Sequence, residues 1–557
     1  MRLHKVPVFV FTLLCAAAML LTGCAGGTTQ AVAPTAALAP KSKVSSDMVS
    51  PTTVPEPAVG TAPEADEPLI ARAAVDPTAF IDFDPSSTCV SELYILINVY
   101  ETLTRYTPLG SKDALEPGLA TSWSVSDDGM TWTFKLREGA KFHDGVDFDA
   151  SAVKRSIERT KDRGQCAAYL LDPVSEILTP DPYTVVFKLA YPAPLDTILA
   201  SPYGAWIMSP GAADKDAAWF AAGNEAGTGP YRFARYEPGQ RLVVQRFDDY
   251  WGGWQPGQFD TVVFEMLDDN VAAEQMLRAG ELDFANQITL TPDQMAGLDG
   301  TNGLRLGAAP SVGNLLVFLN HRRPPTDDVR VRQALAYSFP YKSVVANTLL
   351  GKGTLAHNAV PTSVWGHDPE PSPYVEDLDK AASLLMQAGH ADGLDLTLSY
   401  NPTDQTLAEL WQANLAKIGV TLKLEPADFP IRWDAAKAAP EKAPEAFLFG
   451  WTPDVADPYS YLFNLFHTED QPLWNLGFYS DPAFDTLIDQ ARRQTAVDQT
   501  AASAQYIDAQ RMLADDAAAI FAVDAPELNI IADDIRGFET NLGYAHLAYW
   551  YDLRREK

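Results

Sequence analysis

Strand-like and helix-like segments alternate along the chain from Leu69 onward, and this alternation restricts the fold more than any other feature. Such an order is typical of α/β proteins, in which helices pack on the faces of a sheet. The chain has 557 residues, and a single hydrophobic core rarely grows beyond roughly 250–300 residues. We therefore expect an α/β protein with more than one lobe.

The N-terminus has the pattern of an export signal. Arg2 and Lys5 precede an uncharged apolar run from Val6 to Leu21, which Thr22 and Gly23 separate from Cys24. The run has about 16 residues, fewer than the roughly 20 that a membrane-spanning helix needs, so a spanning helix is the weaker interpretation. Leu-Thr-Gly-Cys resembles a bacterial lipobox, which predicts a signal peptide at residues 1–23 and lipid modification of Cys24.

Residues 24–68 differ in composition from the rest of the chain. They are rich in Ala, Pro, Thr, Ser and Val and show neither helical nor strand periodicity. This composition predicts a disordered tether that lets the folded part move above the membrane. The formal net charge of the chain is −31, which argues against nucleic acid as a partner because such binding depends on Lys and Arg.

The sequence contains four cysteines, of which Cys15 lies in the signal and Cys24 is the lipid acceptor. Cys89 and Cys166 remain. In an oxidising exterior these two can form a disulfide, and the alternative is a pair of buried thiols.

Period-two alternation predicts several strands. Ser122–Val125 and Thr131–Arg137 flank Asp127-Asp128-Gly129 and form a β-hairpin, and Tyr183–Leu189 adds a third strand to a small sheet. Helices are predicted at Glu92–Tyr106, Ala150–Thr160, Val271–Gly280, Val329–Phe339, Leu378–Gly389, Leu407–Gly419 and Thr500–Ala514.

The usual catalytic signatures are missing from the sequence. It contains no His-Glu-x-x-His, no Gly-x-Ser-x-Gly and no paired Cys-x-x-Cys. His143-Asp144 precedes Gly145, where Asp-Gly favours a turn over a metal site. We therefore predict no catalytic residue, no metal ligand and no cofactor, although an exported enzyme stays as a third hypothesis.

Four blocks of the sequence carry recognisable motifs. The first block contains Val-Tyr-Glu-Thr-Leu at 99–103 and Phe-His-Asp-Gly at 142–145, and the second contains Gly-Thr-Gly-Pro-Tyr at 227–231 and Tyr-Trp-Gly-Gly at 250–253. The third and fourth are Asp-Val-Arg-Val-Arg-Gln-Ala-Leu at 328–335 and Gly-Trp-Thr-Pro-Asp at 450–454. Together they span nearly everything from Leu69 onward, and they resemble the extracytoplasmic solute-binding proteins of family 5, which serve importers of peptides, oligopeptides and nickel.

The resemblance implies a two-lobed, hinge-bending fold of the periplasmic-binding-protein type (type II), with an extra subdomain inserted in the first lobe. The lobes would close around a ligand. The implied division is lobe I at 69–114, 204–312 and 523–557, the inserted subdomain at 115–203, and lobe II at 313–522.

The resemblance also implies a ligand site at the fourth block. In peptide-binding members, an aspartate at the position of Asp454 pairs with the α-ammonium group of the ligand, and Trp451 would line the same wall. A carboxylate in a closing site forms a charge-assisted hydrogen bond with an ammonium group. The alternative is that Asp454 orders its own loop and that Trp451 is a core residue.

The loop before the first predicted long helix faces the ligand in relatives, which adds Ser87, Thr88 and Cys89 to the candidate contacts. Small polar residues and a helix N-terminus can receive an anion such as a peptide carboxylate, although capping the helix is the commoner role.

We therefore expect a lipid-anchored, monomeric receptor on the outer face of the cell membrane, or in the periplasm, that delivers a peptide to the permease subunits and ATPases of an importer. A nickel chelate, an oligosaccharide or another small solute is the alternative ligand. A sensor or chaperone without coupling to import is the alternative role.

Overall fold

The computed structural model describes residues 67–556, except 78–81, 88–91, 110, 112, 439, 471 and 545–546, and except the side chains at 166, 167, 429, 430, 438 and 542. The predicted signal peptide, Cys24 and residues 25–66 of the predicted tether lie outside the described residues. None of the helices in the described part of the chain is long and apolar enough to cross a membrane.

One large mixed sheet of eleven strands forms the framework of the α/β fold. Its order is β15-β14-β16-β12-β17-β11-β1-β10-β9-β8, and β13 pairs with β17 outside this path. The strands of the first half, which we call lobe I, are β1 (Ile70–Val75), β8 (Tyr231–Glu237), β9 (Arg241–Arg246), β10 (Thr261–Met266) and β11 (Phe284–Asn286). The strands of the second half, lobe II, are β13 (Thr354–Leu355), β14 (Leu394–Tyr400), β15 (Val420–Pro426) and β16 (Ala446–Trp451).

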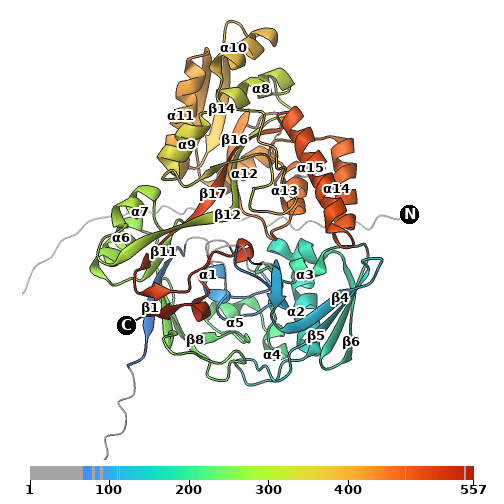
Figure 1. The fold of residues 1–557 in the computed structure, drawn as a ribbon, viewed down its shortest axis with the longest axis vertical. Helices are drawn as coiled ribbons and strands as arrows, with labels where there is room; N and C mark the ends of the chain where they lie inside the picture. The colour runs from blue at the N-terminus through green and yellow to red at the C-terminus, as the bar shows by residue number, and fades with distance from the viewer. Residues whose placement is uncertain are drawn as a thin grey trace, which may run out of the picture. The chain divides into compact units, whose positions relative to one another are not determined.

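Two long antiparallel strands join the two lobes, as Figure 1 shows. They are β12 (Leu304–Leu319) and β17 (Ala519–Ala532). The C-terminal part of β12 pairs with β16, whereas the C-terminal part of β17 pairs with β11. Their mutual register shifts between Pro310 and Asn314 and again between Leu315 and Leu316. Such irregularities bend and twist a strand locally, and here they lie where the two strands pass from one lobe to the other.

Helices cover both faces of the lobe II half of the sheet. Phe447, Phe449 and Trp451 of β16 join the core on one face, and Ala446 and Leu448 join the core on the other, as the alternation of a strand requires. The first core is covered by α12 (Phe429–Ala438), α13 (Pro458–Phe466), α14 (Pro482–Thr495) and α15 (Gln499–Asp515). The second is covered by α8 (Val329–Ser338), α9 (Tyr341–Thr348), α10 (Leu378–Gln387) and α11 (Gln405–Ala416).

Short elements complete lobe I. Its helices are α1 (Leu93–Leu96), α4 (Pro210–Ala213), α5 (Ala217–Ala221), α6 (Asn270–Ala279) and α7 (Pro292–Leu298). Two small strand pairs are β2 (Thr104–Tyr106) with β3 (Leu115–Pro117), and β18 (Ile535–Arg536) with β19 (Arg554–Arg555). The 3₁₀ turns of this lobe are η3 (Leu542–Tyr544) and η4 (Trp550–Asp552), whereas η2 (Pro402–Asp404) belongs to lobe II.

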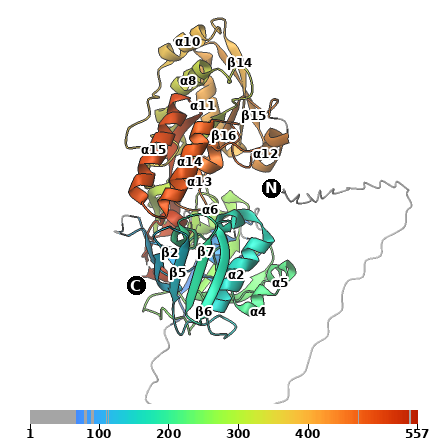
Figure 2. The same cartoon turned by 90° about the vertical axis from the view of Figure 1, so that its right-hand side faces the viewer.

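A separate antiparallel sheet of four strands, in the order β4-β5-β7-β6, carries its own core. We call it, with its helices, the four-stranded subdomain; α2 lies beside its strands in Figure 2. The predicted hairpin is confirmed, since β4 and β5 pair across a turn in which Gly129 has a φ of 70°. The members are β4 (Ala120–Val125), β5 (Thr131–Leu136), α2 (Ala150–Arg163), η1 (Cys166–Leu171), β6 (Val174–Asp181), β7 (Thr184–Leu189) and α3 (Leu195–Ile198).

The long helix predicted at Glu92–Tyr106 is wrong. The helix ends after four residues, because Asn98 is bonded to distant parts of the chain. Its side chain donates to the carbonyl of Ala548 at 3.1 Å and accepts from the backbone N–H of Trp550 at 2.8 Å. Thr104–Tyr106 then pairs as β2 with β3. Long-range contacts therefore override the local helical pattern. The other six predicted helices are present, with ends shifted by a few residues.

Candidate functional site

Asp454 lies between β16 and α13, and its side chain contacts the four-stranded subdomain. The hydroxyl of Tyr169, in η1, donates a hydrogen bond to Oδ2 of Asp454. The side-chain amide of Asn464 on α13 donates to the Tyr169 oxygen at 3.1 Å. The hydroxyl of Ser201, just after α3, donates to the main-chain carbonyl of Asp454 at 2.7 Å. Tyr169 therefore binds the carboxylate of Asp454 directly, Asn464 supports Tyr169, and Ser201 fixes the backbone at Asp454.

The residues that follow Asp454 also contact the other parts of the chain. Val455 is only 6 % exposed and packs in the core of the four-stranded subdomain. The backbone N–H of Ala456 donates to the hydroxyl of Tyr106, in β2 of lobe I, at 3.3 Å. The loop after β16 is therefore a contact surface between lobe II and the rest of the protein.

Burial raises the pKa of Asp454 to about 6, although the hydrogen bond from Tyr169 opposes the shift. Burial also raises the pKa of Tyr169 well above its usual value, so Tyr169 keeps its proton and acts as the donor. Among the described residues, none donates a hydrogen bond to Oδ1 of Asp454. A carboxylate of this kind gains from a cationic partner, because the cation offsets the cost of burying the charge.

Trp451 is a core residue with one unused polar atom. Its ring is 5.5 Å from that of Trp474 and 6.0 Å from that of Phe449, measured between centroids, and the residue is 6 % exposed. The indole N–H is buried and has no hydrogen-bond partner in the described part of the chain. A buried donor without a partner is uncommon and calls for an explanation such as a ligand or an ordered water.

Asp457, which is 4 % exposed, is a buried carboxylate in the same loop. It caps α13 by accepting a hydrogen bond from the backbone N–H of Tyr459 at 2.8 Å. Burial raises its pKa to about 7, the hydrogen bond from Tyr459 opposes the shift, and the nearby charge of Arg492 opposes it further. This loop therefore carries two carboxylates that titrate close to neutral pH.

Ser87 makes local hydrogen bonds in its loop. Its hydroxyl lies 3.3 Å from the carbonyl of Asp84 and 3.4 Å from the carboxylate of Asp82. The carboxylate of Asp84 is paired with Arg159 of α2 and lies 3.5 Å from Arg163. Thr88, Cys89 and the side chain of Cys166 lie outside the described residues, as does Cys24, so the predicted disulfide and lipid site do too.

The Phe-His-Asp-Gly and Gly-Thr-Gly-Pro-Tyr segments serve the fold. Nδ1 of His143 lies 2.8 Å from the carboxylate of Glu225, and Nε2 lies 2.8 Å from the carbonyl of Gly229. A Cβ atom on Gly227 would lie 1.9 Å from the carbonyl oxygen of Val99, so only glycine fits there. In the described part of the chain, no group of three or more His, Cys, Asp or Glu side chains could hold a metal ion.

Three contributors to the surroundings of Asp454 were not predicted: Tyr169, Ser201 and Asn464. Tyr169 is 285 positions from Asp454 in the sequence. Each is an isolated polar residue with no flanking pattern, so no local signal could have identified it.

Comparison with known proteins shows which family and which individual proteins this chain is similar to. The family described as "Bacterial extracellular solute-binding proteins, family 5 Middle" matches residues 114–472. The probable D,D-dipeptide-binding periplasmic protein DdpA of Escherichia coli K12 is 31 % identical over 487 residues, which cover 85 % of this chain and 91 % of that protein. The glutathione-binding protein GsiB of E. coli O1:K1 / APEC is 33 % identical over 386 residues, which cover 67 % and 74 % respectively.

A solved structure extends the similarity to three dimensions. The periplasmic binding protein DppA from Helicobacter pylori, in complex with the peptide STSA, aligns with a TM-score of 0.74 at 25 % identity. The alignment covers 88 % of this chain and 98 % of that one. The match therefore includes both lobes and the strands that join them.

Proposed function

Because the chain belongs to family 5 of the bacterial extracellular solute-binding proteins, we propose that its solute is a short peptide with a free amino terminus. The peptide binds through its α-ammonium group to Asp454 and is delivered to the permease of an ABC importer. DdpA and GsiB are named for binding a D,D-dipeptide and glutathione, and the H. pylori DppA structure contains a bound peptide. These three relatives support a peptide as the ligand.

The observation that carries the proposal is the state of the Asp454 carboxylate. Tyr169 fixes one oxygen, the other accepts no hydrogen bond from a described residue, and burial raises the pKa to about 6. An ammonium group that reaches Oδ1 forms a charge-assisted hydrogen bond and stabilises the ionised form. The site therefore binds a ligand with a cationic group more tightly than a ligand that leaves the carboxylate unpaired.

Trp451 gives the proposal a second contact. Its indole N–H is a buried donor near the start of the same loop, and a peptide carbonyl is the acceptor that such a donor requires. The proposal keeps Ser87, Thr88 and Cys89 as candidate contacts for the carboxylate end of the peptide.

The proposal includes the anchor and the partners. Lipid-modified Cys24 would tether a monomeric receptor to the outer face of the membrane, and the tether at residues 24–68 would let it reach the permease. The division into lobe I, an inserted subdomain at 115–203 and lobe II at 313–522 belongs to the same proposal, as does a disulfide between Cys89 and Cys166. The receptor has no catalytic activity of its own.

Isothermal titration calorimetry of the whole chain with one short peptide in two forms tests the proposal. The peptide with a free amino terminus should bind, and its N-acetylated form should bind far more weakly, because it lacks the charge that Asp454 requires. Equal affinity for both forms would overturn the assignment of Asp454. Binding of nickel chelates or oligosaccharides but of no peptide would keep a receptor and replace its ligand.

A further inference from the structure

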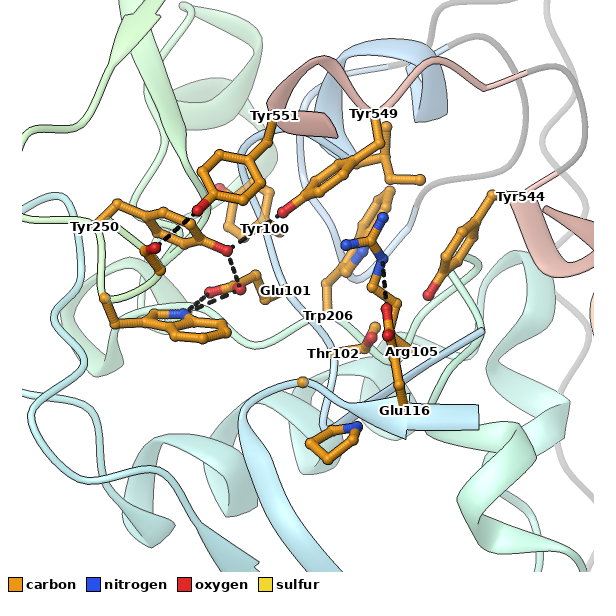
Figure 3. Close-up of a pocket in the computed structure, with 15 residues that line it drawn as sticks. Tyr100, Glu101, Thr102, Arg105, Glu116, Trp206, Tyr250, Tyr544, Tyr549 and Tyr551 are labelled. Carbon is orange, nitrogen blue, oxygen red and sulfur yellow. Dashed lines mark hydrogen bonds and ion pairs between the residues drawn. The ribbon is translucent and has the colours of Figure 1, made fainter. Parts of the chain in front are cut away.

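Lobe I contains a pocket of about 290 Å³ that is separate from Asp454 and its loop. In Figure 3, Glu101 and Tyr250 lie on one side of the pocket, and Arg105 and Glu116 lie on the other. The residues that line it come from positions 97–118, 206 and 250–252 and from the C-terminal segment at 544–551. The volume lies near the lower end of the range for small-molecule sites, which begins at roughly 300 Å³, so the pocket suits a small ligand.

Aromatic rings form much of the pocket wall, and two of them already hold a cation of the chain. The guanidinium of Arg105 lies 3.9 Å from the ring centroid of Tyr549, and that of Arg137 lies 3.6 Å from the ring centroid of Trp251. Trp206 and Tyr100 stack on each other at 6.2 Å at the base of the pocket. The faces of such rings attract positive charge through their quadrupoles.

Glu101 provides a fixed carboxylate at one side of the pocket. The indole N–H of Trp251 donates to its two oxygens at 3.1 and 3.0 Å, and the hydroxyl of Tyr250 donates to Oε1 at 3.0 Å. A carboxylate has about four acceptor sites, so this group can accept a further donor. Burial raises the pKa of Glu101, and the hydrogen bonds from Trp251, Thr228 and Tyr250 and the charge of Arg137 oppose the shift.

The charges of the lining favour a cation over an anion. The guanidinium of Arg105, which faces Glu101 across the pocket, is already paired with Asp552 at 2.7 Å and with Glu116 at 3.8 Å. Its charge is therefore offset. The hydrogen-bond donors to Glu101 are neutral, and Arg137, the cation whose charge acts on Glu101, lies over the ring of Trp251 and does not line the pocket. Aromatic faces around a carboxylate are the arrangement that binds ammonium and quaternary ammonium groups.

We propose that this pocket is a second ligand site, independent of the peptide site, that binds a small organic cation with an ammonium or quaternary ammonium head. The cationic head lies beside the Glu101 carboxylate, among the aromatic rings that line the pocket.

Choline and 3,3-dimethylbutan-1-ol test the proposal, because the second has the shape of choline without its charge. We expect isothermal titration calorimetry of the whole chain to show saturable choline binding and at least about tenfold weaker binding of the neutral alcohol. Absence of choline binding, or equal affinity for the two probes, would overturn the proposal.

Three variants locate the binding. Glu101→Gln should weaken choline binding about tenfold or more, whereas Glu116→Gln, whose side chain is 42 % exposed, should weaken it less and leave the fold intact. Asp454→Asn should leave choline binding unchanged, which separates this pocket from the peptide site.

Two outcomes would refute the site: loss of choline binding in Asp454→Asn, and choline binding of wild-type affinity in folded Glu101→Gln. If Glu101→Gln does not fold, an unchanged choline affinity in Glu116→Gln would refute the site instead.

Discussion

The hydroxyl of Tyr169 donates a hydrogen bond to the carboxylate of Asp454, and this contact joins the four-stranded subdomain to the loop after β16. The same loop places Val455 in the subdomain core and bonds Ala456 to Tyr106 of lobe I. The carboxylate that we assign to the ligand is thus also a contact between the lobes. A group in that position can couple ligand binding to lobe closure, because a ligand shifts an equilibrium only through contacts that differ between the two states.

The charge of Asp454 can be removed without changing the shape of the side chain. We expect Asp454→Asn to weaken binding of a peptide with a free amino terminus by roughly 2–5 kcal/mol, because the ammonium group loses its charged partner. Titration calorimetry at pH 7.5 measures this change. Asp508→Asn is the matched control, since its side chain is 67 % exposed on α15, and it should bind as the wild type does. An unchanged affinity in Asp454→Asn would contradict the ion pair.

Peptide binding should depend on pH through Asp454. Its pKa is raised to about 6, so the ionised form that binds an ammonium group is present above pH 6 and is lost as the pH falls below it. We therefore expect peptide affinity to decrease between pH 7.5 and pH 5.

Tyr169→Phe should move this profile to higher pH, because the hydrogen bond from Tyr169 lowers the pKa of Asp454. The variant should bind weakly at pH 6.5 and recover most of its affinity at pH 8.5. Tyr183→Phe, one position before β7 begins, serves as the control. A loss of affinity in Tyr169→Phe that is equal at every pH would indicate a packing role alone.

Asp457→Asn should stabilise the unliganded protein at high pH. The pKa of Asp457 is raised to about 7 from an unfolded value near 3.9. A raised carboxyl pKa means that the folded state prefers the protonated form, so stability is lost progressively as the pH rises from about 4 to about 7. Asparagine removes the charge and can still cap α13 by accepting from Tyr459.

Denaturant unfolding at two pH values measures the effect of Asp457→Asn. We expect a gain on the order of 1–3 kcal/mol at pH 8.5 and little change at pH 4. A variant that is less stable than the wild type at pH 8.5 would show that the ionised carboxylate is needed, for example by Arg492.

The parts of this structure that could be predicted from sequence are those specified by local pattern. The alternation in Thr131–Leu136 and Thr184–Leu189 indicated β5 and β7, because half-buried strands repeat every two residues. The helix at Glu92–Tyr106 was wrong because its pattern was local, whereas Asn98 is held by bonds to Ala548 and Trp550.

The candidate site also has a part that the sequence could predict and a part that it could not. Asp454 was named from a resemblance in the segment that contains it, and the structure alone shows what surrounds it. Tyr169 and Ser201 reach it from segments more than 250 positions earlier in the chain. The raised pKa of its carboxyl group is a consequence of that packing and has no counterpart in the local sequence.

The last prediction concerns the close approach between Gly227 and Val99. A Cβ atom at position 227 would lie 1.9 Å from the carbonyl oxygen of Val99, and backbone cannot yield as the end of a flexible side chain does. The carbonyl of Gly227 also accepts from the backbone N–H of His143 at 2.8 Å, so a shift at Gly227 breaks a contact with the turn at His143. We expect Gly227→Ala to destabilise the protein by roughly 3 kcal/mol, at the upper end of the cost of overpacking.

Gly211→Ala on α4 is the control, because the nearest atom to its Cβ would be 3.8 Å away, and it should destabilise the protein far less. Denaturant midpoints of the two variants decide the matter, and equal midpoints would mean that the backbone at Gly227 moves without cost.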